Sequence, residues 1–379
     1  MINDRRQKQA ALSYVIGKHW FPQLELIIQP TRSSTSKIYE ITDIDVYGAV
    51  PDEFTAYRSI LFDCKSSRRE SPVTRALWLS GLMTHFDASW GICVLSDQKD
   101  ISLDHRETAA ELDVSLMTMT EFDVFSNATD GYLPSGTSNL SDLDKWDLYF
   151  SIGKTQPSLQ PSIDFATRRY WALMAPGDAV RHSIVLLRTL RGELDPKKKE
   201  HQVVFGDILS LFLFALAKVG HRLFRAFLQP GSRQDLDSVL LPYIYGGRET
   251  YQLISQLSSA IPRKAEDATP KEPYFPEWDM FVNMVRSLLD APMQALVAPL
   301  LAREIAWSRF EDNSPLTYSS TIARAQRQTG KFCIQAARYL TAAARLPPEF
   351  SEIYQQIFLS IQSPPSEQVV TQPRLPIAG

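Results

Sequence analysis

The chain has 379 residues, of which 44% are hydrophobic and 22% charged, as in an ordinary globular protein with room for two domains. The net charge of -3 and the pI of about 6.1 argue against a protein whose whole surface coats nucleic acid, so any nucleic-acid contact must come from a local patch. The three cysteines are far apart, so neither a zinc knuckle nor a disulfide framework is indicated.

The first part of the chain begins with a predicted helix and three predicted strands. Residues from about 4 to 18 carry apolar side chains at helical spacing. Turn-forming segments then separate three stretches with strand character. We expect strands at residues 24–29, 39–48 and 57–67.

Further helices and strands alternate after this point. Ser71 and Pro72 suit the start of a helix, as N-cap and first helical residue. Residues 90–96 form a short apolar run that is typical of a buried strand. Asp104 and Glu107 form a D-x-x-E capping box that opens a helix to about residue 112, and residues 114–122 predict a fifth strand. Consecutive strands followed by strand–helix–strand units predict a mixed sheet with helices on its faces.

The rest of the chain has a different character. Residues 127–144 are rich in turn formers, which suggests a domain boundary. Beyond it the long apolar segments are helical, while the last residues are polar and rich in proline, as in a disordered tail. We therefore predict an α/β domain followed by an all-α domain. The boundaries are 1–125 for the α/β domain, 126–160 for a linker, 161–362 for the helical domain and 363–379 for the tail.

Localisation is inferred from two segments. The N-terminus lacks the apolar core and cleavage site of a signal peptide. The most apolar run, residues 208–217, is bounded by Asp207 and Lys218, which leaves about half of the ~20 residues that span a bilayer. We predict a buried core helix there, no membrane association and a cytoplasmic protein.

Two short polar motifs stand out on the second and third predicted strands, D-I-D at 43–45 and D-C-K at 63–65. Side chains alternate along a strand, so Asp43 and Asp45 share one face, and so do Asp63 and Lys65. Paired strands would bring these carboxylates and the ammonium together. Gathering like charges is unfavourable, and a bound Mg²⁺ or Mn²⁺, which prefers oxygen ligands, would offset the cost. Such a site suits phosphodiester hydrolysis.

At residues 4–125 the chain resembles the PD-(D/E)XK nuclease superfamily. ITDIDVYG resembles the first acidic strand of that family and ILFDCKSS the strand that carries D/E-x-K. The resemblance implies a restriction-endonuclease-like fold with Asp45, Asp63 and Lys65 as catalytic residues. It further implies that Asp45, Asp63 and the backbone carbonyl of Cys64 bind the metal.

The resemblance departs from the family at the first helix, where many members place a glutamate. Here the stretch RRQKQAAL offers only Gln7 or Gln9. Asp43 and Gln9 are expected to contact the metal ligands rather than the metal itself. Residues that follow the third strand are candidates for phosphate binding, with a solvated loop as the alternative. They are Ser66, Ser67, Arg68 and Arg69.

The functional expectation is a Mg²⁺-dependent endonuclease that acts on nucleic acid, with DNA favoured, in a bacterial restriction, antiphage or DNA-repair system. The helical domain would bind substrate, form a homodimer or dock onto a partner subunit. The alternative is a catalytically silent, nuclease-like scaffold or nucleic-acid-binding subunit of a larger complex. The acidic pI and the absent first-helix glutamate favour this alternative, whereas the retained Asp45, Asp63 and Lys65 oppose it.

Overall fold

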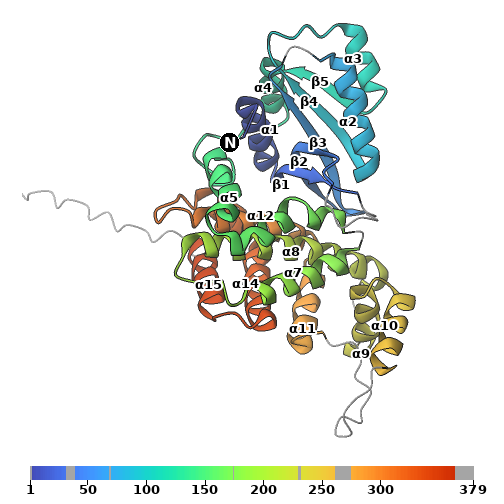
Figure 1. The fold of residues 1–379 in the computed structure, drawn as a ribbon, viewed down its shortest axis with the longest axis vertical. Coiled ribbons are helices and arrows are strands. Elements are labelled where there is room, and N and C mark those ends of the chain that lie inside the picture. Colours follow the sequence, from blue (N-terminus) through green and yellow to red (C-terminus); the bar gives the residue numbers. More distant parts are fainter. Residues whose placement is uncertain are drawn as a thin grey trace, which may run out of the picture.

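A computed structural model describes residues 2–30, 39–67, 70–173, 175–228, 232–260 and 275–362. The first part folds as a five-stranded sheet with flanking helices (Figure 1). Its elements are α1 (Arg5–Gly17), β1 (Phe21–Ile28), β2 (Thr42–Asp52), β3 (Ala56–Lys65), α2 (Pro72–Phe86), β4 (Ala88–Leu95), α3 (Leu103–Ala110), β5 (Val114–Thr118) and α4 (Met119–Ala128).

The sheet is mixed, as predicted from the order of the elements. Its strands lie in the order β1-β2-β3-β4-β5. The first three are antiparallel neighbours, and the β3–β4 and β4–β5 pairs are parallel. Helix α1 covers β2, where Val15 lies against Gly48, and α2 covers β4, where Leu79 and Met83 lie against Gly91. Both glycines make room for these close contacts.

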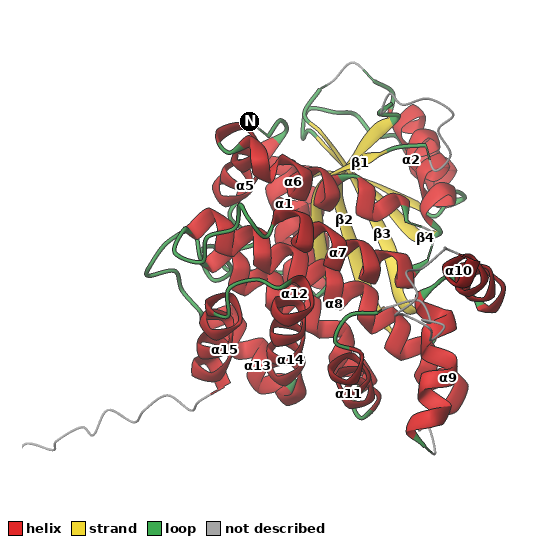
Figure 2. Cartoon of the chain, turned by 60° about the horizontal axis from the view of Figure 1, so that its bottom comes forward, coloured by secondary structure: helices red, strands yellow, loops and turns green. Residues whose placement is uncertain are grey.

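The rest of the described chain is helical, as predicted. Both views show the sheet standing on a helical layer that includes α8 and α12 (Figure 2). The elements are α5 (Leu143–Thr155), η1 (Pro157–Leu159), α6 (Gln160–Thr167), η2 (Arg169–Ala172), α7 (Pro176–Leu190), α8 (Lys199–Phe227), α9 (Arg233–Ile244), α10 (Arg248–Ala260), α11 (Trp278–Leu289), α12 (Pro292–Ser308), α13 (Thr317–Ala325), α14 (Arg327–Ala344) and α15 (Glu349–Gln362).

Helix α8 is the centre of this layer. It is long and apolar enough to cross a membrane by length and composition, but 94% of its most apolar stretch is buried inside the protein. The predicted core run, residues 208–217, is buried throughout. The apolar surface of α8 is therefore covered by the neighbouring helices, as the prediction of a core helix requires.

The segment 126–160 differs from the linker predicted for it. Helix α5 lies within this segment, and its Trp146 is fully buried. The preceding turn is anchored by the buried carboxylate of Glu304 on α12, which accepts hydrogen bonds from Ser138 Oγ at 2.6 Å and from the Leu140 amide at 3.0 Å. Turn-forming residues here build a packed connection, because their polar groups find partners inside the protein. The predicted tail, 363–379, lies outside the described residues.

A second buried network joins the sheet to the helices. The guanidinium of Arg303 on α12 is fully buried. It pairs with Asp207 on α8, with Nε 2.7 Å from Oδ1, and donates to the Pro22 carbonyl on β1 at 2.7 Å. Because the bonds of one side chain connect both parts of the chain, we expect the sheet and the helical layer to form one cooperative unit.

Two local predictions were wrong in their details. The helix at 103–110 is capped by Ser102, whose hydroxyl accepts from the His105 amide, and not by Asp104. The fifth strand ends at Thr118 and not at Phe122. Thr118 and Glu121 form a reciprocal capping box that starts α4, and this local pairing outweighs the strand propensity of the following residues.

Candidate metal and phosphodiester site

The predicted residues Asp45, Asp63 and Lys65 converge where β2 and β3 separate. The ladder between these strands reaches Val46↔Phe62, and beyond it Asp45 Oδ2 accepts the Cys64 amide at 2.7 Å. Lys65 Nζ lies 3.5 Å from Asp45 Oδ2 and 3.8 Å from Asp63 Oδ1. The alternation of side chains along the strands therefore brings the three predicted residues together.

The surrounding protein differs from a simple two-aspartate metal site. The buried carboxylate of Asp63 is held by Arg75 on α2, whose Nε donates to Oδ2 at 2.8 Å and whose Nη2 donates to Oδ1. Arg75 also stacks over the Trp78 ring, 4.2 Å from its centroid. Burial raises the pKa of Asp63, against the opposing effect of Arg75. As the protein stands, Asp63 is neutralised by a guanidinium.

Asp45 forms its closest charge contact with the first helix. Lys8 on α1 is buried, and its Nζ lies 2.8 Å from Asp45 Oδ1. The same ammonium donates to Glu25 on β1. Burial lowers the pKa of Lys8, but the charges of Asp45 and Glu25 outweigh this and raise it overall. The first helix thus supplies a cation at the point where the family resemblance leads one to expect an acid.

Glu25 is an acidic group that the strand pattern did not reveal. Its backbone has φ 51° within β1, a left-handed conformation that costs a non-glycine residue roughly 1–2 kcal/mol. The flanking Leu24 and Leu26 are fully buried and pair with β2 on either side of it. Burial raises the pKa of Glu25, and Lys8 opposes the rise.

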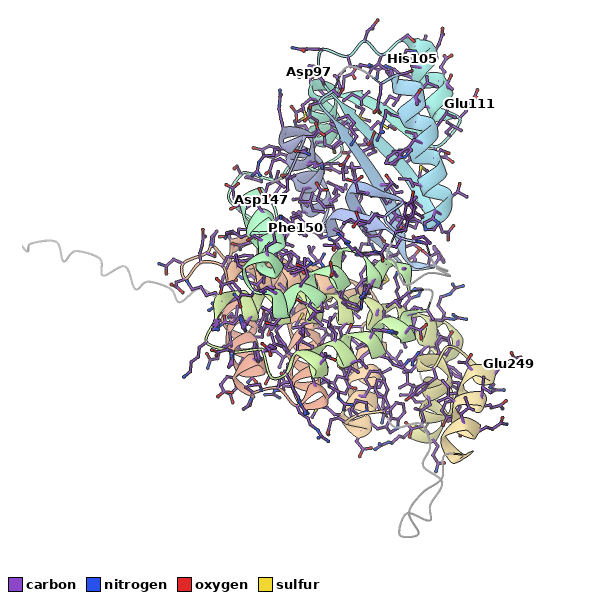
Figure 3. The ribbon with its side chains drawn as sticks, in the orientation of Figure 1. Asp97, His105, Glu111, Asp147, Phe150 and Glu249 are labelled. Carbon is purple, nitrogen blue, oxygen red and sulfur yellow. The ribbon has the colours of Figure 1, made fainter. Side chains whose placement is uncertain are left out.

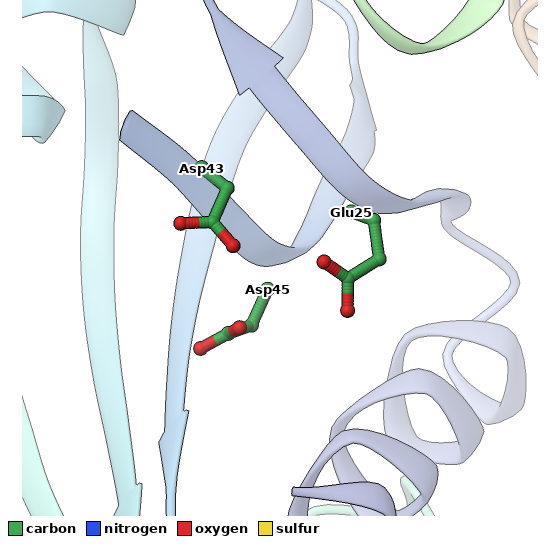
Figure 4. Close-up of side chains that lie close together, drawn as sticks. All are labelled: Glu25, Asp43 and Asp45. Atoms are coloured by element: carbon green, nitrogen blue, oxygen red, sulfur yellow. The ribbon is translucent and has the colours of Figure 1, made fainter. Parts of the chain in front are cut away.

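Three carboxylates form a cluster that could hold a divalent cation. One oxygen each of Glu25, Asp43 and Asp45 lies within 4.8 Å of the others (Figure 4). These hard oxygen donors fit Mg²⁺ or Mn²⁺. Asp63 lies outside this cluster, so the predicted pair of ligands is not assembled as such. The Cys64 amide donates to Asp45, and the carbonyl of a strand residue points to the same edge as its amide, so the predicted Cys64 carbonyl is directed to the Asp45 side of β3.

The cluster opens into a cavity of about 540 Å³. One wall is formed by β1, β2 and β3, with Lys65 on β3, and by Lys8 on α1. The opposite wall is α5, from which Asp147, Phe150 and Lys154 line the cavity; Figure 3 shows the first two at the junction of sheet and helices. The cavity is therefore built from the α/β part and from a helix that the sequence assigned to a linker.

The remaining predicted residues lie apart from the cluster. Gln9 donates to Ser13 Oγ at 3.1 Å and to the Ser141 carbonyl, so it points to a different cavity and does not support the ligands. Ser66 donates both its amide and its hydroxyl to Asp4. Ser67 is exposed. Arg68 and Arg69 fall outside the described residues.

Three functional neighbours were missed from the sequence: Lys8, Glu25 and Arg75. Lys8 stands among charged and polar residues at the start of α1, which gives no sign of burial. Glu25 stands between two leucines on its strand, a pattern that usually places a charge on the solvent side. Arg75 lies in the first turn of α2, the helix that follows the D-x-K strand. This short separation in the sequence could have indicated a contact between Arg75 and Asp63.

Comparisons with known proteins identify no relative. A scan against protein-family models, a search of curated proteins and a search of solved structures each returned no match.

Proposed function

We propose that this chain is a metal-dependent nuclease of the PD-(D/E)XK type that hydrolyses phosphodiester bonds, with DNA as the favoured substrate. The observation that supports it is the position of Lys65, whose ammonium lies within 4 Å of both Asp45 and Asp63 at the mouth of a polar cavity. Acidic groups beside a lysine on a splayed pair of strands suit the cleavage of an anionic ester.

The residues have distinct roles in this proposal. Asp45, together with Asp43 and Glu25, would hold Mg²⁺ or Mn²⁺, which supplies a polarised phosphoryl oxygen and a water of lowered pKa. Lys65 lies between Asp45 and Asp63. Burial lowers its pKa, but the negative charges of these two carboxylates outweigh this and raise it overall. Asp63 would position this ammonium, and Lys65 would act as a positive charge facing the developing negative charge of the phosphoryl group. Lys154 is exposed on the opposite wall and would contact a neighbouring backbone phosphate.

Cleavage assays test the proposal directly. Supercoiled and linear DNA would be incubated with the protein and Mg²⁺, Mn²⁺ or EDTA, comparing the wild type with Asp63→Asn, Asp63→Ala and Lys65→Ala. We expect metal-dependent cleavage by the wild type and a loss of roughly 10²–10³-fold or more in each variant. Circular dichroism would establish that the variants fold. Cleavage that persists in both Asp63→Ala and Lys65→Ala would end the assignment.

A specific observation favours a second candidate, a catalytically silent nuclease-like scaffold. Lys8 and Arg75 already pair with the carboxylates of Asp45, Glu25 and Asp63, so the charges are largely balanced without a metal. Calorimetric titration with Mn²⁺ separates the two candidates. Absence of Mn²⁺ binding, together with an Asp45→Ala variant that associates with itself or with partners as the wild type does, would favour the scaffold.

The biological setting is proposed by analogy with the resembled family. We infer a cytoplasmic component of a bacterial restriction, antiphage or repair system. The helical layer would contribute substrate contacts through α5 and would serve as the surface for a second copy or a partner subunit. Size-exclusion chromatography with light scattering would test self-association.

A further inference from the structure

A second cavity, of about 590 Å³, lies at the opposite end of β2 from the acidic cluster. The β2–β3 turn forms one side and the C-terminal half of α8 the other. Asp45 and the turn at Asp52 are separated by seven positions along a strand, or roughly 23 Å at ~3.3 Å per residue, so the two cavities are distinct. The residues that line the second cavity include Phe54, Lys218, His221, Arg222, Arg225 and Tyr243.

The charge of this cavity is positive. Four basic residues of α8 line this cavity. His221, Arg222 and Arg225 come three, four and seven residues after Lys218, so all four share one face of the helix. No carboxylate side chain lines the cavity. Among the residues that the structure describes, no ion pair involves the side chains of Lys218, Arg222 or Arg225.

Fixed contacts hold these basic groups in place. His221 Nε2 donates to the Glu53 carbonyl at 2.8 Å, and Arg225 donates to the Phe54 carbonyl. Arg222 lies over the Tyr243 ring, 4.7 Å from its centroid. Lys218 Nζ lies 4.5 Å from the Phe214 ring centroid. The basic groups are therefore positioned by carbonyls and aromatic rings rather than by acids.

Gathering cations without counter-charges is unfavourable, and burial lowers the pKa of Lys218 to about 8. An anion in the cavity would relieve this cost. The arginine fork matches the oxygens of a phosphate group. Phe54, which is 64% exposed, offers a face on which a planar ring can stack. The volume is within the range of small-molecule sites.

We propose that this cavity binds a phosphorylated small molecule of nucleotide size, with the phosphate on Arg222, Arg225 and Lys218 and a planar ring against Phe54. The site uses none of the residues assigned to phosphodiester hydrolysis. It would give the protein a ligand-binding function whether or not the acidic cluster is active.

Isothermal titration in EDTA, with inorganic phosphate, AMP, ATP and adenosine as probes, tests this proposal. We expect binding of AMP and ATP, weaker binding of phosphate and little of adenosine. Arg222→Gln and Arg225→Gln should each weaken binding roughly tenfold or more, because a hydrogen bond to a charged group is lost. Arg222→Lys should fall between wild type and Arg222→Gln.

Two variants serve as matched controls. Arg324→Gln removes an exposed arginine from α13, and Asp63→Asn alters the acidic site; both should bind AMP as the wild type does. Failure of AMP and ATP to bind the folded protein would overturn the proposal, as would binding that both arginine variants retain. Tight binding of a ten-nucleotide single strand through the same arginines, without binding of mononucleotides, would instead identify a nucleic-acid contact and also overturn it.

Discussion

The ammonium of Lys8 lies 2.8 Å from Oδ1 of Asp45, and each of the two side chains is only 4% exposed. Asp45 Oδ2 is engaged by the Cys64 amide and faces Lys65. Both oxygens of the central carboxylate therefore have partners within the chain. A divalent cation at Asp45 must compete with Lys8, so Lys8 is expected to set the metal affinity of the acidic cluster.

Replacement of Lys8 by methionine tests this competition. The change keeps most of the side-chain volume and removes the charge. We expect Lys8→Met to bind Mn²⁺ at least tenfold more tightly, because a cation beside the metal is removed. Without metal it should be less stable by about 3–5 kcal/mol, since Asp45 is left buried and poorly compensated. Calorimetric titration and urea unfolding measure the two effects.

Lys18 provides the control for this comparison, because it directly follows α1 and donates to the Thr129 carbonyl rather than to a carboxylate. Lys18→Met should leave the Mn²⁺ affinity unchanged. An unchanged or weaker affinity in Lys8→Met would show that Lys8 does not compete with the metal.

Arg75 is predicted to be a major source of stability for the sheet edge. Arg75→Met would leave the buried Asp63 carboxylate without its bidentate partner, at a cost of about 3–5 kcal/mol. Arg75→Lys should recover only part of this loss, because an ammonium can neither form the two parallel bonds nor stack as well on Trp78. Urea unfolding monitored by circular dichroism gives the free energies.

The pair of Arg58 and Asp52, in which the arginine is exposed, is the reference for Arg75. The Arg58 side chain is 56% exposed, so Arg58→Met should cost no more than about 1 kcal/mol. Equal losses for Arg58→Met and Arg75→Met would contradict the special role given to the buried pair.

Arg303 is predicted to couple the sheet to the helical layer. Calorimetry of the wild type should show one unfolding transition. Arg303→Met removes the bonds to Asp207, Pro22 and Gln23 and should destabilise the protein by about 3–5 kcal/mol, while the exposed Arg324→Met should change it by less than about 0.5 kcal/mol. Two separate transitions in the wild type would mean that the two parts unfold independently.

The sequence predicted the convergence of Asp45, Asp63 and Lys65 because strand alternation is a local rule. Asp63 and Lys65 are two residues apart on β3, and the neighbouring Val46 and Phe62 pair across β2 and β3. The order of helices and strands likewise rests on local patterns. These features needed no knowledge of which elements meet in space.

The partners of those residues depend on tertiary packing and could not be predicted in the same way. Nothing local tells that Lys8 on α1 faces Glu25 on β1, or that Glu25 adopts a positive φ. Helix α5 is a different case. Its Leu143, Trp146 and Tyr149 recur at helical spacing and are buried, and this signal was outweighed by the turn formers before it.

The basic cavity should show a pH dependence that originates in Lys218, whose pKa burial lowers to about 8. As the pH rises from 7 to 9 the ammonium loses its proton, so the affinity for AMP should fall several-fold. The other titratable groups that line the same cavity are His221, Arg222 and Arg225 on α8, Tyr57 on β3 and Tyr243 on α9. The adjoining cavity, which Lys218 also lines, includes Tyr47, His85, Asp87 and Tyr170.

The arginines, the buried tyrosines and the ligand do not account for such a fall. Arginines keep their charge up to pH 9, burial raises the pKa of Tyr47, Tyr57 and Tyr170, and a phosphate monoester with a second pKa of about 6 is already dianionic at pH 7. Lys218→Met should bind AMP more weakly at pH 7 and show little further change at pH 9. A wild-type affinity that is flat over this range, or a fall of equal size in Lys218→Met, would mean that Lys218 does not contact the phosphate. Because the variant lacks only the titrating ammonium, the difference between the two pH profiles isolates the contribution of that one group.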